Sequence, residues 1–566
     1  MSLPWRESAN MTDNNVPESV VGNGGTAVAL ALEALGVECV FAIPSAHNLA
    51  ILKAIHRRGR IRVVGCRHEQ GVAHAADGYA RTTGRLAVGI VSTGPGTANA
   101  MGGMYEAHHA SSPVMLITSQ VESRYLGRGF GYVHEADNQA SMLRAVCRDV
   151  RTIERADEIA ETIVQLGRAA VRGRPRPVAV EIPTDLQEQE WLEISVATLH
   201  AEAAASTPRT RPAPVAVDRA AAVLSSARRP LIWAGGGVIR SGAETALRRF
   251  AEKWDAPILT SREGRGSVPE DSERSLGAVA TTSEMREFIS QCDVLLAVGT
   301  RFQQYPTGEW TVPFPSRMVH LDVDPAVIGR SYPPEVAVIG DAEVGLEMLT
   351  KALPERAVDE ASARVAHLEH GRAAASSMRA EQRARAGRDQ SAICESINRR
   401  RPRGGVVVRD ATVPAYVWGE GLLEIWEPRT SIRSTAAGIG PGLPLAIGAG
   451  LASGNHVIVL QGDGGFMLSV GELATAVQAK APVVICLFND AGYQMLRNIE
   501  SRIGDGELHD VELATPDFTK LAESFGARSA HVTSAAAFDA ALAHALTVEG
   551  PTLIEIDMRS LESMRP

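Results

Sequence analysis

Short runs of Val, Ile and Leu recur along this sequence, separated by longer alanine-rich stretches in which apolar residues have helical spacing. Examples of the short runs are CVFAI (39–43), LAVGIV (86–91), VMLIT (114–118) and VAVEIP (178–183). Runs that are apolar throughout are typical of strands buried on both faces of a parallel sheet, and parallel strands require long, usually helical crossovers. This alternation therefore predicts an α/β chain with doubly wound parallel sheets.

The alternation occurs in three blocks, and 566 residues are too many for one hydrophobic core. Segments that are polar, or rich in alanine and proline, lie between the blocks. We predict a flexible tail (1–21), a first α/β domain (22–190), a linker (191–218), a central Rossmann-like domain (219–355), a helical linker (356–389) and a third α/β domain (390–566).

The composition excludes several classes of protein. A net charge of −9 argues against nucleic acid as the main partner. No window contains the roughly 18 consecutive apolar residues of a membrane span, and the polar start lacks the apolar core of a signal peptide. The six cysteines are scattered without metal-ligand spacing. We expect them to be buried free thiols in the reducing cytoplasm.

A glycine-rich turn, QGDGGFMLSV (461–470), follows one predicted strand of the third block, and NDAGY (489–493) follows the next strand. Because neighbouring parallel strands end at the same edge of a sheet, Asp463 and Asn489 should face each other. A carboxylate and an amide are hard oxygen ligands that suit Mg²⁺, which keeps further positions for a carbonyl, a water and phosphates. The glycines let backbone N–H groups approach phosphates closely. The pair predicts a magnesium-diphosphate site.

The first block contains RHEQGVAHAADGYARTTGR (67–85), in which Glu69 lies between a predicted strand and a helix. Together with the GDG and ND segments, it resembles the signature of thiamine diphosphate (ThDP) enzymes of the acetolactate synthase and benzoylformate decarboxylase family. The resemblance covers nearly the whole chain, through STGPGTAN (92–99), SSPVMLITSQV (111–121), VEIPTDL (180–186), GRGSVPED (264–271) and GIGPGLPLAIGAG (438–450). It implies that the first domain binds the pyrimidine and the third domain the diphosphate.

The resemblance also implies roles for individual residues. Glu69 would hydrogen-bond N1′ of the aminopyrimidine and favour the imino tautomer that deprotonates the thiazolium C2; a plain helix-cap contact is the alternative. Asp463, Asn489 and the Ala491 carbonyl would bind Mg²⁺. Ile439 would prop the cofactor into a V shape, with core packing as the alternative. The remaining expected cofactor contacts are Pro44, Asn99, Thr412, Ala437, Gly462, Gly464, Gly465, Gly492 and Tyr493.

In this family the two domains that meet over one cofactor come from different chains. We therefore expect a homodimer with shared active sites, and a tetramer is common. The central segment GGGVIRSGA (235–243) looks like a dinucleotide-binding turn, but a lone GGG is a weak signal. Relatives hold FAD, ADP or nothing in this domain, and we expect nothing.

The substrate end departs from the family pattern. Ser111 and Gln303 stand where benzoylformate decarboxylase has two histidines, and Ile499 stands where acetolactate synthases have a tryptophan. Neither Ser nor Gln carries a proton at neutral pH as imidazole does. The expected substrate pocket consists of Ser111, Gln303, Met495 and Ile499. Besides Glu69, the catalytic candidates are Gln303, His47 and His134.

These departures favour an acetolactate-synthase-like decarboxylase or carboligase that acts on a 2-oxo acid. A true acetolactate synthase is one alternative. A 2-hydroxyacyl-CoA lyase is another, although no single segment supplies an obvious basic cluster for the phosphates of coenzyme A; such a cluster could assemble from separate segments. The alternative outside enzymology is a catalytically silent ThDP-binding relative, against which the presence of Glu69 argues.

Overall fold

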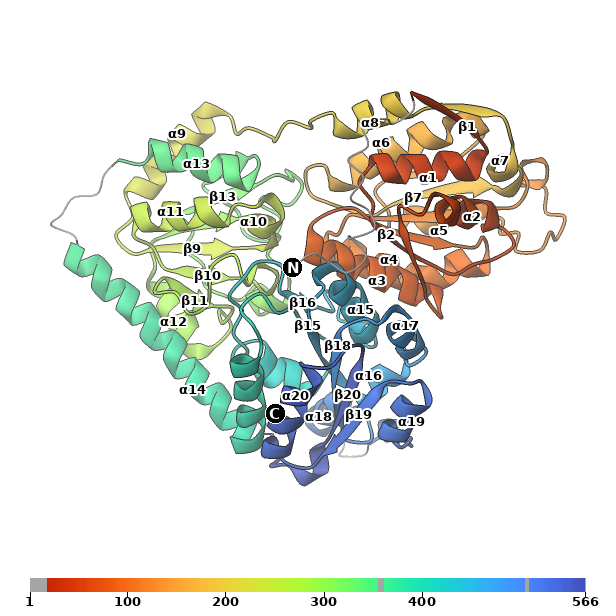
Figure 1. Cartoon of the computed structure of the whole chain (residues 1–566). Coiled ribbons are helices and arrows are strands. Elements are labelled where there is room, and N and C mark those ends of the chain that lie inside the picture. Colours follow the sequence, from red (N-terminus) through yellow and green to blue (C-terminus); the bar gives the residue numbers. More distant parts are fainter. Residues whose placement is uncertain (1–17, 355–360, 504–507, 565–566) are drawn as a thin grey trace.

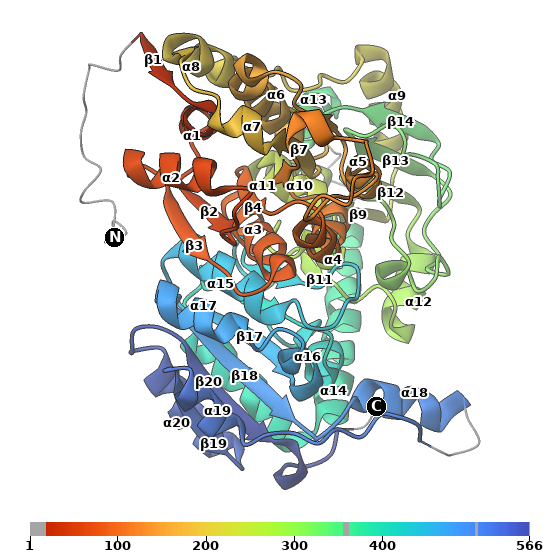
Figure 2. The ribbon, with the colours of Figure 1, turned by 90° about the vertical axis from the view of Figure 1, so that its right-hand side faces the viewer.

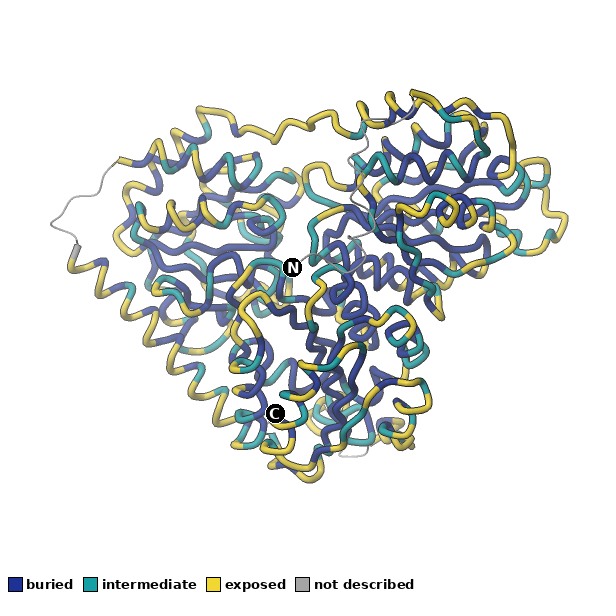
Figure 3. Tube along the Cα trace, viewed as in Figure 1, coloured by how far each residue is buried: buried dark blue, intermediate teal, exposed yellow. Residues whose placement is uncertain are grey.

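The computed structural model describes residues 18–354, 361–503 and 508–564. Three α/β domains each contain a six-stranded parallel sheet with helices on both faces (Figure 1). This confirms the predicted fold class. Figure 3 shows the sheets as the most deeply buried part of each domain. Most of the predicted tail, residues 1–17, lies outside the described residues.

The first domain has the strand order β3-β2-β4-β5-β7-β6. Its strands are β2 (Cys39–Ala42), β3 (Arg62–Gly65), β4 (Ala87–Val91), β5 (Val114–Gln120), β6 (Val150–Thr152) and β7 (Val178–Pro183). Its helices are α1 (Gly24–Ala34), α2 (Leu49–Arg58), α3 (Glu69–Thr83), α4 (Pro95–Ala110), α5 (Gln139–Arg144), α6 (Ile159–Val171) and α7 (Thr184–Glu188).

The first domain extends beyond the predicted limits at both ends. β1 (Ser19–Gly22), placed by prediction largely in the tail, pairs antiparallel with β8 (Leu192–Ser195), placed in the linker. The next helix, α8 (Val196–Ala204), buries Val196 and Leu199 in the core of the same domain. The connection to the central domain is therefore shorter than predicted.

The central domain has the strand order β11-β10-β9-β12-β13-β14. Its strands are β9 (Pro230–Ala234), β10 (Ile258–Thr260), β11 (Ser275–Gly277), β12 (Val294–Val298), β13 (Met318–Asp322) and β14 (Val336–Ile339). Its helices are α9 (Pro214–Ser225), α10 (Gly236–Ser241), α11 (Glu244–Trp254), α12 (Ser283–Gln291) and α13 (Ala342–Ala352).

A long helix, α14 (Ala361–Arg400), connects the central and third domains along the outside of the molecule (Figure 1). It is broken at Gly387, whose φ of 77° lies in the left-handed region. Before the break, Met378 is buried in the central core and Ala386 in the third; after it, Ile393 and Ile397 are also buried in the third. The predicted helical linker is thus part of both cores, and the helix continues beyond residue 389.

The third domain has the strand order β16-β15-β17-β18-β20-β19. Its strands are β15 (Val407–Arg409), β16 (Ser431–Arg433), β17 (Val457–Gly462), β18 (Val483–Asn489), β19 (Arg528–Val532) and β20 (Thr552–Asp557). Its helices are α15 (Gly442–Ser453), α16 (Asp463–Met467), α17 (Glu472–Ala479), α18 (Gln494–Ile503), α19 (Phe518–Ser524) and α20 (Ala535–Ala545).

The first and third domains pack against each other through α3 and α15 (Figure 2). Glycines permit the close approach of these helices: a β-carbon at Gly78 would lie 2.0 Å from the Leu445 carbonyl oxygen, and one at Gly448 would lie 1.9 Å from that of Ala75. One hydrophobic cluster spans both domains. This contact fixes where the edges of the two sheets lie relative to each other.

All six cysteines are free and buried, as predicted. Among the described residues, no helix has the length and apolar character needed to cross a membrane.

Candidate active site

The structure brings the two loops singled out in the third domain together. β17 and β18 are adjacent and parallel, with Gly462 opposite Phe488, so Asp463 and Asn489 follow neighbouring strand ends. The Gly492 N–H donates a hydrogen bond of 3.0 Å to Asp463 Oδ2. The carboxylate at the start of α16 therefore contacts the loop after Asn489, as strand adjacency requires.

The side chain of Asn489 is held in one orientation. Its Nδ2 donates to Glu555 Oε1 at 2.7 Å, and its Oδ1 accepts from the Ala491 N–H at 3.1 Å. Ala491 has a φ of 57°, in the left-handed region. Its carbonyl accepts a hydrogen bond of 2.9 Å from Arg497. A carbonyl oxygen has two lone pairs, so this contact leaves one for a further partner.

The carboxyl groups of Asp463 and Asp490 lie close together beside Asn489, and their charges are only partly neutralised. Burial raises the pKa of Asp463. Burial and the neighbouring Asp463 raise the pKa of Asp490 to about 7, although Arg497 lies 3.4 Å away. Removing carboxylates from water without full pairing is costly, and a divalent cation would relieve that cost.

The glycines form a surface that larger residues would fill. A β-carbon at Gly464 would lie 2.4 Å from the Tyr493 ring, and one at Gly462 would lie 3.2 Å from Thr412 Oγ1. Because glycine places no side chain here, a ligand can approach the backbone closely at this edge of the sheet.

Ile439 projects from a loop fixed by Asp410, a residue that our sequence analysis did not identify. The Asp410 carboxyl accepts hydrogen bonds from the N–H groups of Gly440 and Gly442 and from Gln461. Burial raises the pKa of Asp410 to about 6. Ile439 is 38% exposed, beside Gly465, so it is not a core residue. The only available signal was the position of Asp410 directly after a strand.

In the first domain, Glu69 is the first residue of α3 and accepts a hydrogen bond of 3.0 Å from Asn99 on α4. A β-carbon at Gly96 would lie 3.0 Å from Ser92 and 3.4 Å from the Glu69 carboxylate. Ser45, which follows Pro44, donates to Ser92 at 2.9 Å. The ends of β2 and β4 and the starts of α3 and α4 therefore converge here.

Two predicted histidines join this cluster. The rings of His47 and His134 stack with 4.9 Å between centroids, and His134 Nδ1 lies 3.2 Å from Ser92 Oγ. Burial and His134 lower the pKa of His47 below its ordinary value. Ser92, which our sequence analysis did not select, connects the histidines to the neighbourhood of Glu69.

Ser111 lies elsewhere, which corrects its predicted place in the substrate pocket. It caps the C-terminal end of α4 and accepts a hydrogen bond from Arg174. Asn99, the partner of Glu69, lies twelve residues earlier on this helix, about 18 Å away at the rise of an α-helix. Ser111 instead lines a cavity of the central domain, together with Gln303.

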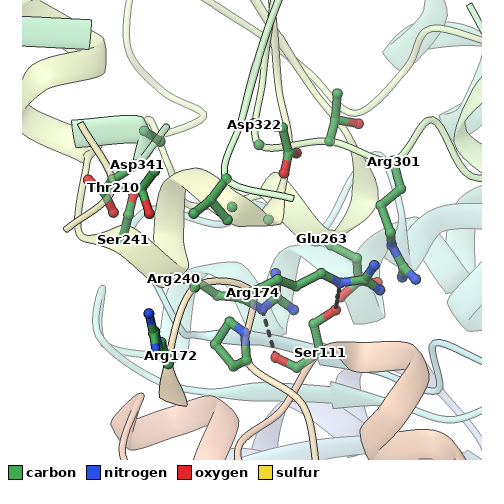
Figure 4. A pocket seen from close by; sticks show the side chains of 18 of the residues that line it. Ser111, Arg172, Arg174, Thr210, Arg240, Ser241, Glu263, Arg301, Asp322 and Asp341 are labelled. Carbon is green, nitrogen blue, oxygen red and sulfur yellow. Dashed lines mark hydrogen bonds between the residues drawn. The ribbon is translucent and has the colours of Figure 1, made fainter. Parts of the chain in front are cut away.

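This cavity has a volume of about 440 Å³ and lies where the strand order of the central sheet reverses, between β9 and β12. Figure 4 shows Arg174, Arg240 and Arg301 near Ser111, with Asp322 above them. Burial and the other two arginines lower the pKa of Arg301 to about 9, and burial lowers that of Arg240 to about 10. Such closely placed cations favour an anionic ligand.

The other two predicted pocket residues, Met495 and Ile499, lie on α18. This helix projects from the third domain (Figure 2) and contains no fully buried residue. Ile499 is 42% exposed.

Comparison with known proteins is consistent with this architecture. The chain matches the N-terminal TPP-binding domain of thiamine pyrophosphate enzymes over residues 22–142, their central domain over 217–349 and their C-terminal TPP-binding domain over 414–556. Thiamine pyrophosphate (TPP) is a synonym of thiamine diphosphate. Each match falls within a different one of the three domains.

Curated relatives match along nearly the whole chain. A probable acetolactate synthase large subunit of Methanocaldococcus jannaschii is 30% identical over 96% of this chain and 93% of its own length. A probable 2-ketoarginine decarboxylase of Pseudomonas aeruginosa is 35% identical over 89% of this chain and 88% of its own length. The acetolactate synthase isozyme 2 large subunit of Escherichia coli is 30% identical, over 96% and 97%. The chain therefore belongs to the thiamine pyrophosphate enzymes, in the family of the acetolactate synthases and related decarboxylases.

Proposed function

We propose that the protein is an enzyme that uses ThDP and Mg²⁺ to break or form a carbon–carbon bond beside the carbonyl of a 2-oxo acid. The observation that carries the proposal is the placement of Glu69, which Asn99 orients beside Ser92 and the histidine pair. Bound ThDP supplies a nucleophilic carbon and accepts the electrons released when CO₂ leaves. A relative without turnover would not need an oriented carboxylate here.

The third domain fits the cofactor that the family implies. Asp463, Asn489 and the Ala491 carbonyl form a donor set of hard oxygens, which suits Mg²⁺. The N–H groups around Gly464 and Gly465 would bind the diphosphate. The other two expected donors are engaged within the protein: the Gly492 N–H donates to Asp463 and the Tyr493 N–H to the Val511 carbonyl, so they would have to exchange these partners to bind it. Ile439 would support the bent cofactor, with the backbone of Ala437 against the pyrimidine.

In the first domain, Glu69 would hold the proton at N1′ of the pyrimidine, next to Pro44. His47 and His134, which Ser92 joins to the neighbourhood of this carboxylate, would exchange a proton with substrate or product. Because the pKa of His47 is lowered, its ring is neutral at pH 7 and can act as a base. We propose that one chain's first domain and a second chain's third domain complete each site in a homodimer, which can pair into a tetramer.

For the reaction, we propose decarboxylation or carboligation of a 2-oxo acid in preference to dedicated acetolactate synthesis. The histidine pair supports this choice because an imidazole that has taken up a proton can pass it on to a released product. The probable 2-ketoarginine decarboxylase among the relatives is named for such a reaction.

The central cavity supports a second candidate, a 2-hydroxyacyl-CoA lyase. We predicted an empty central domain, but the three half-buried arginines fit the phosphates of a nucleotide such as ADP, FAD or the coenzyme A moiety. Titration calorimetry with each compound tests this fit. Binding of coenzyme A together with cleavage of a 2-hydroxyacyl-CoA would select the lyase.

The main proposal is tested with purified protein, ThDP and Mg²⁺. Exchange of the C2 proton of ThDP, followed by NMR in D₂O, should be faster than for free ThDP. A panel of 2-oxo acids, followed by NMR for CO₂ loss, aldehyde and acyloin, then identifies the reaction. No acceleration of exchange would favour the silent relative, and exclusive formation of acetolactate from pyruvate would favour acetolactate synthase.

A further inference from the structure

Helix α4 carries two polar side chains that contact different parts of the proposed active site, one in the first domain and one in the third. Asn99 and Glu106 are seven residues apart, about two helical turns, and so lie on the same side of the helix. Asn99 donates to Glu69 within the first domain. Glu106 instead contacts the third domain of the same chain: it accepts hydrogen bonds from the N–H groups of Thr435 at 2.6 Å and Ala436 at 2.9 Å.

Glu106 is 3% exposed and belongs to a buried ionic network. Arg81 on α3 donates to Glu106 at 2.6 Å and to Asp77 at 2.7 Å. The same guanidinium donates to the Arg433 carbonyl at 2.6 Å. Although burial raises the pKa of Glu106, Arg81 and the two N–H groups lower it overall, so the side chain is a carboxylate at neutral pH.

The segment that Glu106 holds is the start of the Ile439 loop, residues 434–440. Asp410 fixes the other end through the Gly440 N–H. Within the loop, Ser434 donates to the Gly438 carbonyl at 2.7 Å. Ala437 has a φ of 61°, which costs a non-glycine residue conformational energy. Hydrogen bonds at both ends therefore hold a strained loop from which a half-exposed Ile439 projects.

We propose that Glu106 is a positioning residue that sets the Ile439 loop from the first domain, and that α4 thereby couples this loop to the Asn99–Glu69 pair. The inference rests on the proposed function, which gives Ile439 and Glu69 roles at the cofactor. In the proposed dimer these two residues of one chain serve different cofactors. Helix α4 would then connect the two active sites.

The test compares Glu106→Gln with Asp77→Asn. Asp77 is buried in the same network and bound to the same arginine, but it lies on α3 and holds Arg81 from within the first domain. Glu106→Gln exchanges one acceptor oxygen for an NH₂ group that repels a loop N–H. Glu106→Asp is a milder second variant, since it keeps the charge and only draws the carboxylate back.

Two measurements are made on each full-length variant. The first is amide hydrogen exchange of the peptide covering 433–440 without ThDP; we expect at least tenfold faster exchange in Glu106→Gln, a smaller increase in Glu106→Asp and less than a twofold change in Asp77→Asn. The second is calorimetric titration with ThDP and Mg²⁺. Here Glu106→Gln should weaken binding about tenfold, and Asp77→Asn less than twofold.

The outcomes distinguish a failure of the proposed function from a failure of the proposed role of Glu106. If the native protein binds no ThDP, the proposed function is overturned and this inference with it. If the native protein binds ThDP and Glu106→Gln matches Asp77→Asn in both measurements, only the role of Glu106 is overturned. Faster amide exchange with unchanged ThDP affinity would also overturn it, because Glu106 would then hold the loop without positioning the cofactor.

Discussion

The first and third domains each contribute one half of the proposed active site, and the two halves present different chemical groups. In the third domain, glycine backbone and short oxygen ligands at the ends of β17 and β18 face the site, and interactions such as Asn489 with Glu555 fix them. In the first domain, side chains from separate loops converge, as the stacked His47 and His134 show. The third-domain half is thus suited to anchoring a metal and phosphates, whereas the first-domain half is suited to moving protons. Substitutions should therefore affect binding in one half and chemistry in the other.

The largest effect is expected from Asp463→Ala. It removes the one charged ligand of the proposed Mg²⁺ set, which a water molecule cannot replace. Calorimetric titration with ThDP and Mg²⁺ should then show no saturable binding at concentrations that saturate the native protein. Asp517→Ala, a change at an exposed helix cap of the same domain, is the control. Normal ThDP binding by Asp463→Ala would refute the anchoring role of this half.

Glu69→Gln should show the reverse pattern. The amide keeps the size of the carboxylate but cannot hold a proton at the pyrimidine. General acid–base groups contribute about 10²- to 10⁴-fold, so C2 proton exchange should slow by that order while ThDP affinity changes only a few-fold. NMR exchange and calorimetry on one preparation separate the two quantities. If ThDP affinity and C2 proton exchange fell by similar factors, the proposed division between a binding half and a proton-transfer half would be refuted.

The same difference explains what the sequence could predict. Sheets buried on both faces require continuous apolar runs, so β2, β4, β5 and β7 were visible as strands. A backbone phosphate cradle requires glycines, so the GDG segment was visible as well. The pairing of β1 with β8 was not visible, because both strands are short and lie far apart in the chain.

Residues that act through long-range contacts were the ones missed. Asp410 and Glu106 hold the Ile439 loop from segments that carry no motif, and Ser92 joins the histidines only because three loops converge. The misplacement of Ser111 has a related cause: a linear alignment does not show which end of α4 faces Glu69. These residues were identified only from contacts in the folded protein, because the spacing of residues in the sequence does not reveal such contacts.

Ser92→Ala should lower turnover moderately and leave ThDP binding nearly unchanged. Without the hydroxyl, His134 loses a partner at 3.2 Å and Ser45 loses its acceptor. We expect turnover of the best 2-oxo acid to fall about tenfold, in line with the loss of one hydrogen bond of about 1 kcal/mol or slightly more. ThDP affinity should stay within twofold. Ser469→Ala, near the diphosphate half, is the matched control, and an equal loss of turnover there would contradict the prediction.

The smallest expected effect is on the pH dependence of stability. Its sign should differ between Asp410 in the third domain and His47 in the first. The folded-state pKa of Asp410 is raised to about 6, so the stability it contributes is present below its unfolded pKa and is lost as pH rises through about 6. The folded-state pKa of His47 is lowered by burial and by His134. Its contribution is present above the ordinary histidine value of about 6.5 and is lost as pH falls through the folded-state pKa.

His47→Gln should therefore reduce the loss of stability that the native protein suffers between pH 7 and pH 5. Because the imidazole is only partly buried, solvent screens the interaction, and we expect a change below about 1 kcal/mol. Urea unfolding midpoints at pH 7.5, 6 and 5 measure it, with His56→Gln, at an exposed position on α2, as the control. If the two variants lost stability in parallel with the native protein, the folded protein would not be lowering the pKa of His47. The case for His47 as the proton carrier of the first-domain half would then have to rest on kinetics alone.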